Sequence, residues 1–441
     1  MRDVIVAGVG MTTFGKFFDR SVRSLAEEAL NEALKDASIE PKDVGMVFFA
    51  NAVGGVITTQ EMIRGQSALH HTGLLGVPIL NVENACASSS SAVSMAKMAV
   101  ASGAVDIAIA IGAEKLTHAD KIRSLSAIGT AIDMEDFSMA RDALSKVLLG
   151  WPPPEATSGG STDAKHDSSH NSSSDNSSTK KNKPRTENEK NQGGGQKSAF
   201  MDVYGLAAQL YMQQSGATAE DFAKIASKNH ANGALNPKAQ YRHTVSVQEV
   251  LDSRMVSNPL TLLMCSPIGD GAAAVVLTSR EVARKLGVPM IKLRASVMLS
   301  GKDRSVGEPS VATNAAKKAY EITGVSPEDL NVVELHDAAA PAELMLYEEL
   351  GLAEEGGGPN FLASKATYLG GKVPVNPSGG LLSKGHPIGA TGCAQIVELT
   401  EQLRGHCGAR QVEKARVALA ENGGGFLGTD AAAAVVSILT K

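Results

Sequence analysis

The chain has 441 residues, enough to bury two sizeable cores, and its 43% hydrophobic and 20% charged residues are ordinary for a globular protein. The formal net charge of -5 and the aromatic content of 4% give no reason to expect nucleic acid or an anionic membrane as a partner. No apolar run is long enough to span a bilayer, and the N-terminus does not resemble a signal peptide.

The first part of the chain alternates strand and helix patterns. Apolar runs at 3–9, 44–50, 78–82 and 105–111 predict strands, the first entering a glycine turn, and a helix is expected from about Ser88. Alternation of this kind favours an α/β fold with a mostly parallel sheet. Gly8 and Gly10 lack the third glycine of a dinucleotide-binding turn, so a nucleotide site of that type is a poor fit.

The segment 84–91 places a cysteine between small residues where a strand leads into a helix. Cys86 is therefore expected at a helix N-terminus, where free amides and the helix dipole favour a thiolate. The alternative is a buried structural cysteine. The chain has four cysteines that lie far apart: Cys86, Cys265, Cys393 and Cys407. None has the Cys-x-x-Cys spacing of a metal site. Their number and spacing indicate a reducing compartment, with the cytoplasm as the default.

From about 159 to 196 the chain is rich in Ser, Asn, Lys and Gly and almost free of apolar residues. Such a segment cannot bury enough surface to offset the entropy of ordering it, so we expect disorder. Its two histidines, His166 and His170, are weak metal candidates.

The C-terminal part repeats the plan of the N-terminal part. Residues 326–333 align with 40–47 without a gap, and 415–421 with the glycines after them resemble 105–114 in the same order. Two matches in order indicate a duplicated domain, and a site between two such halves draws residues from both.

Three segments of the second half have the composition of active-site loops. His386 lies in the glycine-rich run 376–392, which can hold a side chain at a fixed angle, and it is the candidate base for Cys86. His336 follows an apolar strand and can donate to a thioester oxygen, while Glu343 lies seven residues later in the sequence, on the same face if a helix begins promptly. A strand at 418–425 ends in three glycines whose amides can hold an oxyanion.

These segments, in this order, resemble the thiolase superfamily, in particular the sterol-carrier-protein-X type and its bacterial and archaeal relatives. The match around Gly385, His386 and Pro387 is the most specific. The resemblance implies duplicated βαβαβαββ halves in a five-layered αβαβα sandwich with a loop domain over coenzyme A. The implied domains are 1–115 plus 244–280 for the N-terminal half, 116–243 for the loop domain, and 281–441 for the C-terminal half.

The resemblance also implies roles. Cys86 is acylated, His386 activates it, and His336 with a water forms one oxyanion hole. The amides of Cys86 and Gly423 form the other. Coenzyme A is a substrate, and no permanent cofactor or metal is implied. Homodimers or dimers of dimers are usual, and relatives pair with a small OB-fold and zinc-ribbon protein.

The chain departs from the family where a second cysteine normally moves the α-proton of the acyl-CoA. The corresponding positions are Glu421 and Ala338. A buried carboxyl group with a raised pKa can replace a thiol as the acid/base. The candidates are Glu343, which is slightly favoured, and Glu421. The alternative is that both carboxylates only cap a helix or pair with backbone. The run 338–340 of alanines also leaves space for a larger or branched acyl group.

The leading function is thiolysis of a 3-oxoacyl-CoA by coenzyme A, or the reverse condensation. Two alternatives stay open: transfer of the acyl group from Cys86 to a non-carbon acceptor, and a scaffold subunit that depends on the small partner.

Overall fold

A computed structural model of the chain describes residues 2–135, 199–305 and 307–441. The predicted disordered insert at 159–196 lies outside the described residues, as do His166 and His170. Within them, no helix is both long enough and apolar enough to cross a bilayer.

Five strands of the first half form a mixed sheet in the order β3-β2-β4-β7-β1. The strands are β1 (Val4–Met11), β2 (Met46–Ala50), β3 (Ile79–Val82), β4 (Ile107–Glu114) and β7 (Gly271–Ser279). β2 is parallel to β3 and β4, whereas β7 is antiparallel to both β4 and β1. All eight residues of β1 and all eight of β4 are buried, as expected for strands covered on both faces.

The second half repeats this order with β8 (Lys292–Ser300), β11 (Ala433–Thr440), β10 (Val417–Gly424) and β9 (Val332–Glu334). Val375 pairs with Val333 in parallel, in the place that β3 holds beside β2. The 3-10 turns η1 (Pro41–Asp43) and η5 (Pro327–Asp329) both begin with a capping box just before the corresponding strands. The predicted duplication is therefore confirmed, and one residue pair, Ile5 with Lys292, joins the two sheets.

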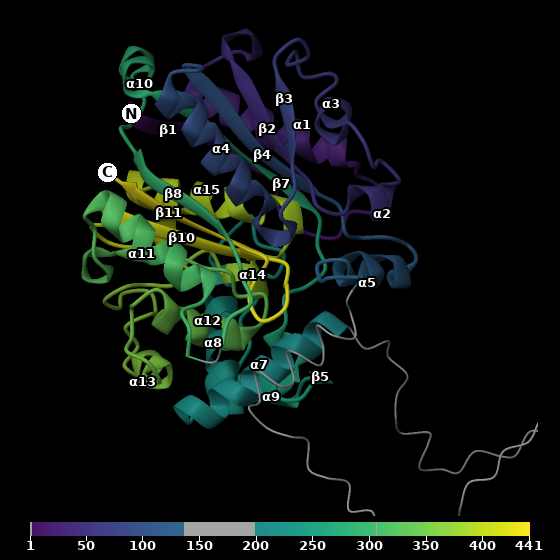
Figure 1. The fold of residues 1–441 in the computed structure, drawn as a ribbon, viewed down its shortest axis with the longest axis vertical. Helices are drawn as coiled ribbons and strands as arrows, with labels where there is room; N and C mark the ends of the chain where they lie inside the picture. Colours follow the sequence, from purple (N-terminus) through teal and green to yellow (C-terminus); the bar gives the residue numbers. More distant parts are fainter. Residues whose placement is uncertain (1, 136–198, 306) are drawn as a thin grey trace, which may run out of the picture.

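Helices complete five layers. α1 (Val22–Ala37) packs on the outer face of the first sheet, and α11 (Val311–Thr323) and α12 (Ala340–Glu349) on the side of the second. α4 (Ser88–Ser102) and α15 (Thr391–Arg404) form the central layer, because their apolar residues share one core with strands of both sheets. Figure 1 shows the first half in purple and blue above the second half in green and yellow.

The remaining elements connect or cover these layers. α7 (Ala199–Ser215), α8 (Ala219–Ala234) and α9 (Val247–Asp252) lie together beyond the second half, in teal in Figure 1. The short elements are α2 (Gly54–Thr58), α3 (Arg64–Ala68), α5 (Lys121–Gly129), β5 (Met255–Ser257), β6 (Leu260–Thr261), α10 (Arg280–Leu286), α13 (Gly358–Ala363) and α14 (Gly380–Ser383). The domain boundaries expected above remain a prediction, since part of 116–243 is outside the described residues.

The predicted glycine turn after the first strand is wrong, because Gly8 and Gly10 lie inside β1. A Cβ atom on either glycine would overlap backbone of α1, at Ala33 and Ala29 respectively. The two glycines therefore let α1 approach the sheet closely.

Candidate active site

Three side chains from two halves of the fold meet at one point. The sulfur of Cys86 and one ring nitrogen each of His336 and His386 all lie within 4.8 Å of one another. Cys86 precedes α4 in the first half, whereas His336 follows β9 and His386 precedes α15 in the second. All three are buried, with at most 7% of each residue exposed.

Cys86 lies in the single turn η2 (Ala85–Ala87) that leads directly into α4. The preceding residue, Ala85, has a φ of 47°, a left-handed conformation that is rare outside glycine. Burial raises the pKa of Cys86 to about 12, although the backbone amides of Gly425 and of Cys86 itself act in the opposite direction. The position of Cys86 before a helix favours a thiolate, as expected, but desolvation outweighs the amides, so a base must remove the thiol proton.

His386 is held in the tautomer that a base requires. Its Nε2 lies 3.2 Å from the sulfur of Cys86, and its Nδ1 lies 2.7 Å from Oγ1 of Thr391. The Thr391 hydroxyl donates its one proton to the carbonyl of Pro387, so it must accept from Nδ1–H. The lone pair of Nε2 then faces the thiol. Burial, with the nearby His336 and Lys384, holds the pKa of His386 well below its usual value, which keeps the ring neutral.

His336 presents a free ring nitrogen next to this pair. Its Nε2 is buried without a hydrogen-bond partner, and its ring centroid is 5.1 Å from that of His386. Burial lowers the pKa of His336 to about 4, so this ring is also neutral. A neutral imidazole with a buried, unpaired nitrogen can donate to a substrate oxygen.

Glu421 and Gly423 lie on the same face of β10, two residues apart. The Oε2 atom of Glu421 accepts from the backbone amide of His336 at 3.1 Å. Burial raises the pKa of Glu421 to about 8, and Glu349 adds to the shift. Both residues line the same cavity as Cys86. The backbone amide of Gly425 donates to the sulfur of Cys86. The expected role of the Gly423 amide in an oxyanion hole stays a prediction.

Glu343 does not line this cavity, and its carboxylate is fully used elsewhere. It forms an ion pair with Lys228 at 2.6 Å and accepts from Asn229 at 2.8 Å, from Asn376 at 2.9 Å and from the Tyr347 hydroxyl. The preference for Glu343 as second acid/base is therefore withdrawn. The helical-face argument fails because α12 begins only at Ala340, four residues after His336.

We expect the substitution Glu343→Gln to destabilise the fold by about 3 kcal/mol, because it leaves the ammonium group of Lys228 buried without a counter-charge. Urea unfolding at pH 7 measures the change. The matched control is Glu281→Gln, which removes the exposed pair with Lys285 and should leave the unfolding midpoint unchanged. A folded Glu343→Gln protein that has lost carbon–carbon cleavage would restore Glu343 as a catalytic candidate.

The cavity at Cys86 has a volume of about 590 Å³. Apolar side chains of α7 and α12 form one part of its wall, and the β10–β11 loop forms another. Ala342, Met345 and Leu346 of α12 belong to it, whereas the alanines at 338–340 do not. The space expected from those three alanines is thus not in the cavity, and α12 itself sets the room available.

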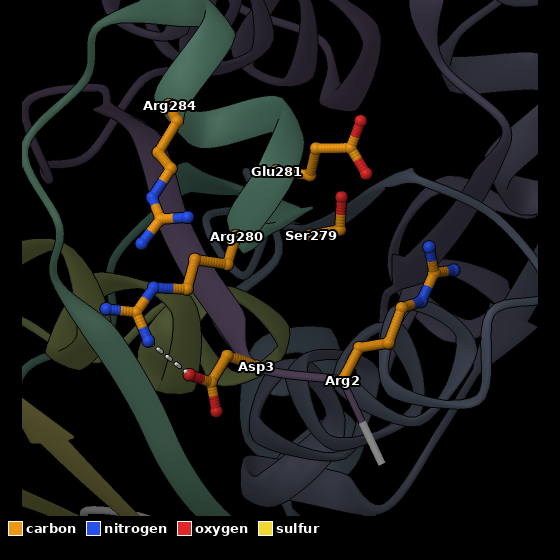
Figure 2. A pocket seen from close by; sticks show the side chains of 6 residues that line it. All are labelled: Arg2, Asp3, Ser279, Arg280, Glu281 and Arg284. Atoms are coloured by element: carbon orange, nitrogen blue, oxygen red, sulfur yellow. Dashed lines mark hydrogen bonds and ion pairs between the residues drawn. The ribbon is translucent and has the colours of Figure 1, made fainter.

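A second hollow lies near the start of β1, where it meets α10 (Figure 2). Its charges largely neutralise each other, since Arg280 pairs with Asp3 at 3.0 Å and Arg2 with Asp106 at 2.7 Å. It contains no cysteine or histidine. We therefore assign the active site to the cavity at Cys86.

Comparison with known proteins agrees with this geometry. Family models described as "Thiolase, N-terminal domain" and "Thiolase C-terminal domain-like" match residues 4–150 and 298–440. The "Acetyl-CoA acetyltransferase" of Methanothermobacter thermautotrophicus is 36% identical over 436 residues, covering 98% of this chain and 98% of that protein. The chain belongs to the thiolase family. It is an enzyme of the acyltransferase class.

Other relatives lie in the same part of the thiolase family. "Benzoylsuccinyl-CoA thiolase subunit BbsB" of Thauera aromatica is 36% identical, with 96% of this chain and 95% of that protein covered. Human "Sterol carrier protein 2" is 35% identical, with 96% and 70% covered. The expected likeness to the sterol-carrier type is confirmed.

Solved structures confirm the fold. "Ltp2-ChsH2(DUF35) aldolase" aligns with a TM-score of 0.70 at 23% identity, over 99% of this chain and 97% of that one. "Acat5 thiolase from Ascaris suum in complex with coenzyme A" aligns with a TM-score of 0.62 at 17% identity, over the full length of both chains.

In this thiolase, the loop that carries His386 is held by a buried carboxylate that the sequence analysis missed. Glu114, at the end of β4, accepts from the amide of Gly389 at 3.0 Å, from Ala52 at 2.8 Å and from the Asn51 side chain at 2.7 Å. Gly389 has no room for a Cβ atom beside this carboxylate. Glu114 thereby ties the His386 loop to the first half. Thr391 was also missed, and its place five residues after His386, at the start of a helix, was the available signal.

Proposed function

We propose that this thiolase cleaves a 3-oxoacyl-CoA with coenzyme A, or runs the reverse condensation, through an acyl thioester on Cys86. The observation that carries the proposal is the contact of 3.2 Å between Cys86 Sγ and a His386 ring whose Nδ1 is committed to Thr391. A thiol with a raised pKa beside a neutral, oriented imidazole is a nucleophile paired with its general base.

In the first half-reaction, His386 Nε2 takes the thiol proton and Cys86 Sγ attacks the 3-oxo carbon. The bond between C2 and C3 then breaks, the acyl group remains on sulfur, and an enolate of acetyl-CoA leaves. The free nitrogen of His336 donates to the enolate oxygen, and the amides of Cys86 and the 423–425 glycines face the oxyanion on the acyl carbon. Before the second half-reaction, His386 passes the proton it took from Cys86 to Glu421, which was ionised when it protonated the enolate carbon. The thiol of coenzyme A then gives its proton to His386 and attacks the acyl thioester. Cys86 leaves as a thiolate and takes that proton back from His386.

Glu421 supplies the proton that the enolate carbon needs. It lines the cavity with Cys86 and His336, and one of its oxygens is held by the His336 amide. A carboxyl group whose pKa is raised by burial to about 8 is protonated at neutral pH, so it can deliver a proton in cleavage and must be ionised to take one in condensation.

The two directions should therefore have opposite pH dependence. Since protonated Glu421 is the working form in cleavage, kcat for thiolysis is expected to fall as the pH rises through about 8, and kcat for condensation to rise over the same interval. Initial rates in both directions between about pH 6 and about pH 10, two units below and above the pKa of Glu421, test this. If kcat changed in the same direction with rising pH for both reactions, the proton transfer would belong to another group.

The test of the reaction itself is product analysis. Incubation of a 3-oxoacyl-CoA with coenzyme A should release two CoA thioesters, acetyl-CoA and a shortened acyl-CoA. An acyltransferase with a non-carbon acceptor would label Cys86 from an acyl-CoA but release no second thioester. A scaffold subunit would do neither without its partner.

Partners follow from the same proposal. We propose coenzyme A and acyl-CoA as ligands, a homodimer or dimer of dimers as the assembly, and the cytoplasm as the location. We also propose a small OB-fold and zinc-ribbon partner; the structural neighbour, whose name "Ltp2-ChsH2(DUF35) aldolase" joins two components, supports assembly with a second protein. Activity measured with and without any co-purifying protein tests that dependence.

A further inference from the structure

The three side chains around the sulfur form a ligand set that suits a thiophilic metal ion. Among the described residues, Cys86, His336 and His386 are the group whose donor atoms lie within 4.8 Å of one another. One thiolate and two imidazoles, with a water in the fourth position, match the three-ligand open sites that Zn²⁺ occupies. We propose that Zn²⁺ binds between these three residues in the substrate-free enzyme and blocks the nucleophile. Metal-ligand spacing in the sequence does not indicate this site, because its three ligands are not neighbours along the chain.

The distances require little rearrangement. Zn–S and Zn–N bonds of about 2.3 Å and 2.0 Å place tetrahedral ligand atoms roughly 3.5 Å apart. The Cys86 Sγ to His386 Nε2 distance of 3.2 Å is already close to this value. The remaining separations, at most 4.8 Å, close by a movement of about 1 Å, which rotation of buried side chains can supply.

The surroundings orient the ligands as a metal site needs. The Nδ1–H of His386 is bound to Thr391, so Nε2 is the nitrogen left for a metal. The Nε2 atom of His336 is buried and has no hydrogen-bond partner. The cavity of about 590 Å³ next to Cys86 provides an entry path and space for a water ligand.

The donor set also predicts which ions bind. Sulfur and imidazole nitrogen favour Zn²⁺ and Cd²⁺, whereas Mg²⁺ and Ca²⁺ require oxygen ligands. On binding, the S–H bond of Cys86 is replaced by an S–Zn bond, and the thiol proton leaves to solvent. The proton of His336 moves from Nε2 to Nδ1, so that the Nε2 lone pair can bind the ion, and no electron is transferred. Both the nucleophile and the lone pair of its base are then occupied, so acylation stops until a chelator removes the ion.

The experiment titrates Zn²⁺ into the full-length, substrate-free protein against a chromophoric chelator. We expect one Zn²⁺ per chain at the Cys86 site, and at least about 100-fold weaker binding there in Cys86→Ala and in His386→Ala. Two controls should keep the wild-type affinity: Cys265→Ala, and the double variant His166→Gln/His170→Gln in the segment outside the described residues. With Co²⁺ as probe, a thiolate-to-metal charge-transfer band should appear in the wild type and be absent in Cys86→Ala.

Equal affinity of Cys86→Ala and wild type, or no Zn²⁺ bound at about 10 µM, would overturn the proposal. The measurement uses no acyl-CoA, so its result is independent of the proposed reaction. A chain that binds Zn²⁺ at Cys86 but cleaves no 3-oxoacyl-CoA would keep this inference and refute the function. An enzyme that cleaves 3-oxoacyl-CoA and is not inhibited by Zn²⁺ would keep the proposed function and refute this inference.

Discussion

Replacing Cys86 by alanine is expected to lower kcat/KM for 3-oxoacyl-CoA cleavage by at least about 10⁴-fold, because no other cysteine of the described residues lines the cavity. The variant should also fail to retain a radiolabelled acyl group after incubation with acyl-CoA. Intact-mass analysis of the rapidly quenched enzyme measures both the acyl adduct and its absence.

Cys393→Ala is the matched control for this substitution. Cys393 is also buried, but its sulfur contacts the backbone carbonyls of Ser89 in α4 and Ala110 in β4 and does not line the cavity. We expect that variant to be acylated at the wild-type rate with a modest loss of stability. Acylation of Cys86→Ala at the wild-type rate would refute the acyl-enzyme and, with it, the roles given to both histidines.

The substitution Glu421→Gln should separate the two halves of the chemistry. The amide keeps an oxygen that can accept from the His336 backbone, but it cannot carry a proton to the enolate. We expect cleavage to fall by roughly 10²–10⁴-fold, the usual contribution of general acid catalysis, while acyl transfer from a saturated acyl-CoA to Cys86 changes by less than about tenfold. Stopped-flow acylation and steady-state thiolysis on the same preparation give the two rates.

Glu349→Gln provides the comparison for Glu421→Gln. Glu349 lines the same cavity, and burial raises its pKa to about 7, so it shares the features that make Glu421 a candidate. It differs in that Glu421 is bonded to the His336 backbone. If Glu349→Gln lost cleavage and Glu421→Gln kept it, the proton transfer would belong to Glu349.

The architecture and the three reacting side chains could be predicted from the sequence because each leaves a local signal. Buried strands appear as apolar runs, the duplication as two ungapped matches, and His386 as the centre of a glycine-rich loop. The convergence of Cys86 with His336 and His386 followed from the resemblance, which fixes how the halves pack.

The identity of the second acid/base could not be decided in this way. Glu343 follows one apolar segment and Glu421 ends another, so their sequence surroundings are alike. The sequence does not show which neighbouring side chains reach each carboxylate. Only the packing of α8 against α12 brings Lys228 and Asn229 to Glu343 and so removes it from the chemistry. The raised pKa of Cys86 could not be predicted for a related reason: a helix start is visible in the sequence, but the degree of burial is not.

The central layer has a consequence for how this enzyme tolerates change. The nucleophile precedes α4 and its base precedes α15, and the two helices touch near these ends, where the Cys393 amide donates to the Ser89 hydroxyl at 3.0 Å and a Cβ on Gly392 would collide with Ser90. The contact between α4 and α15 therefore sets the distance between the Cys86 sulfur and the His386 ring. A methyl group added at Gly392 would push the two helices apart and so separate Cys86 from His386 while the rest of the molecule stays folded. The reactivity of the Cys86 thiol would then report the spacing between the two halves.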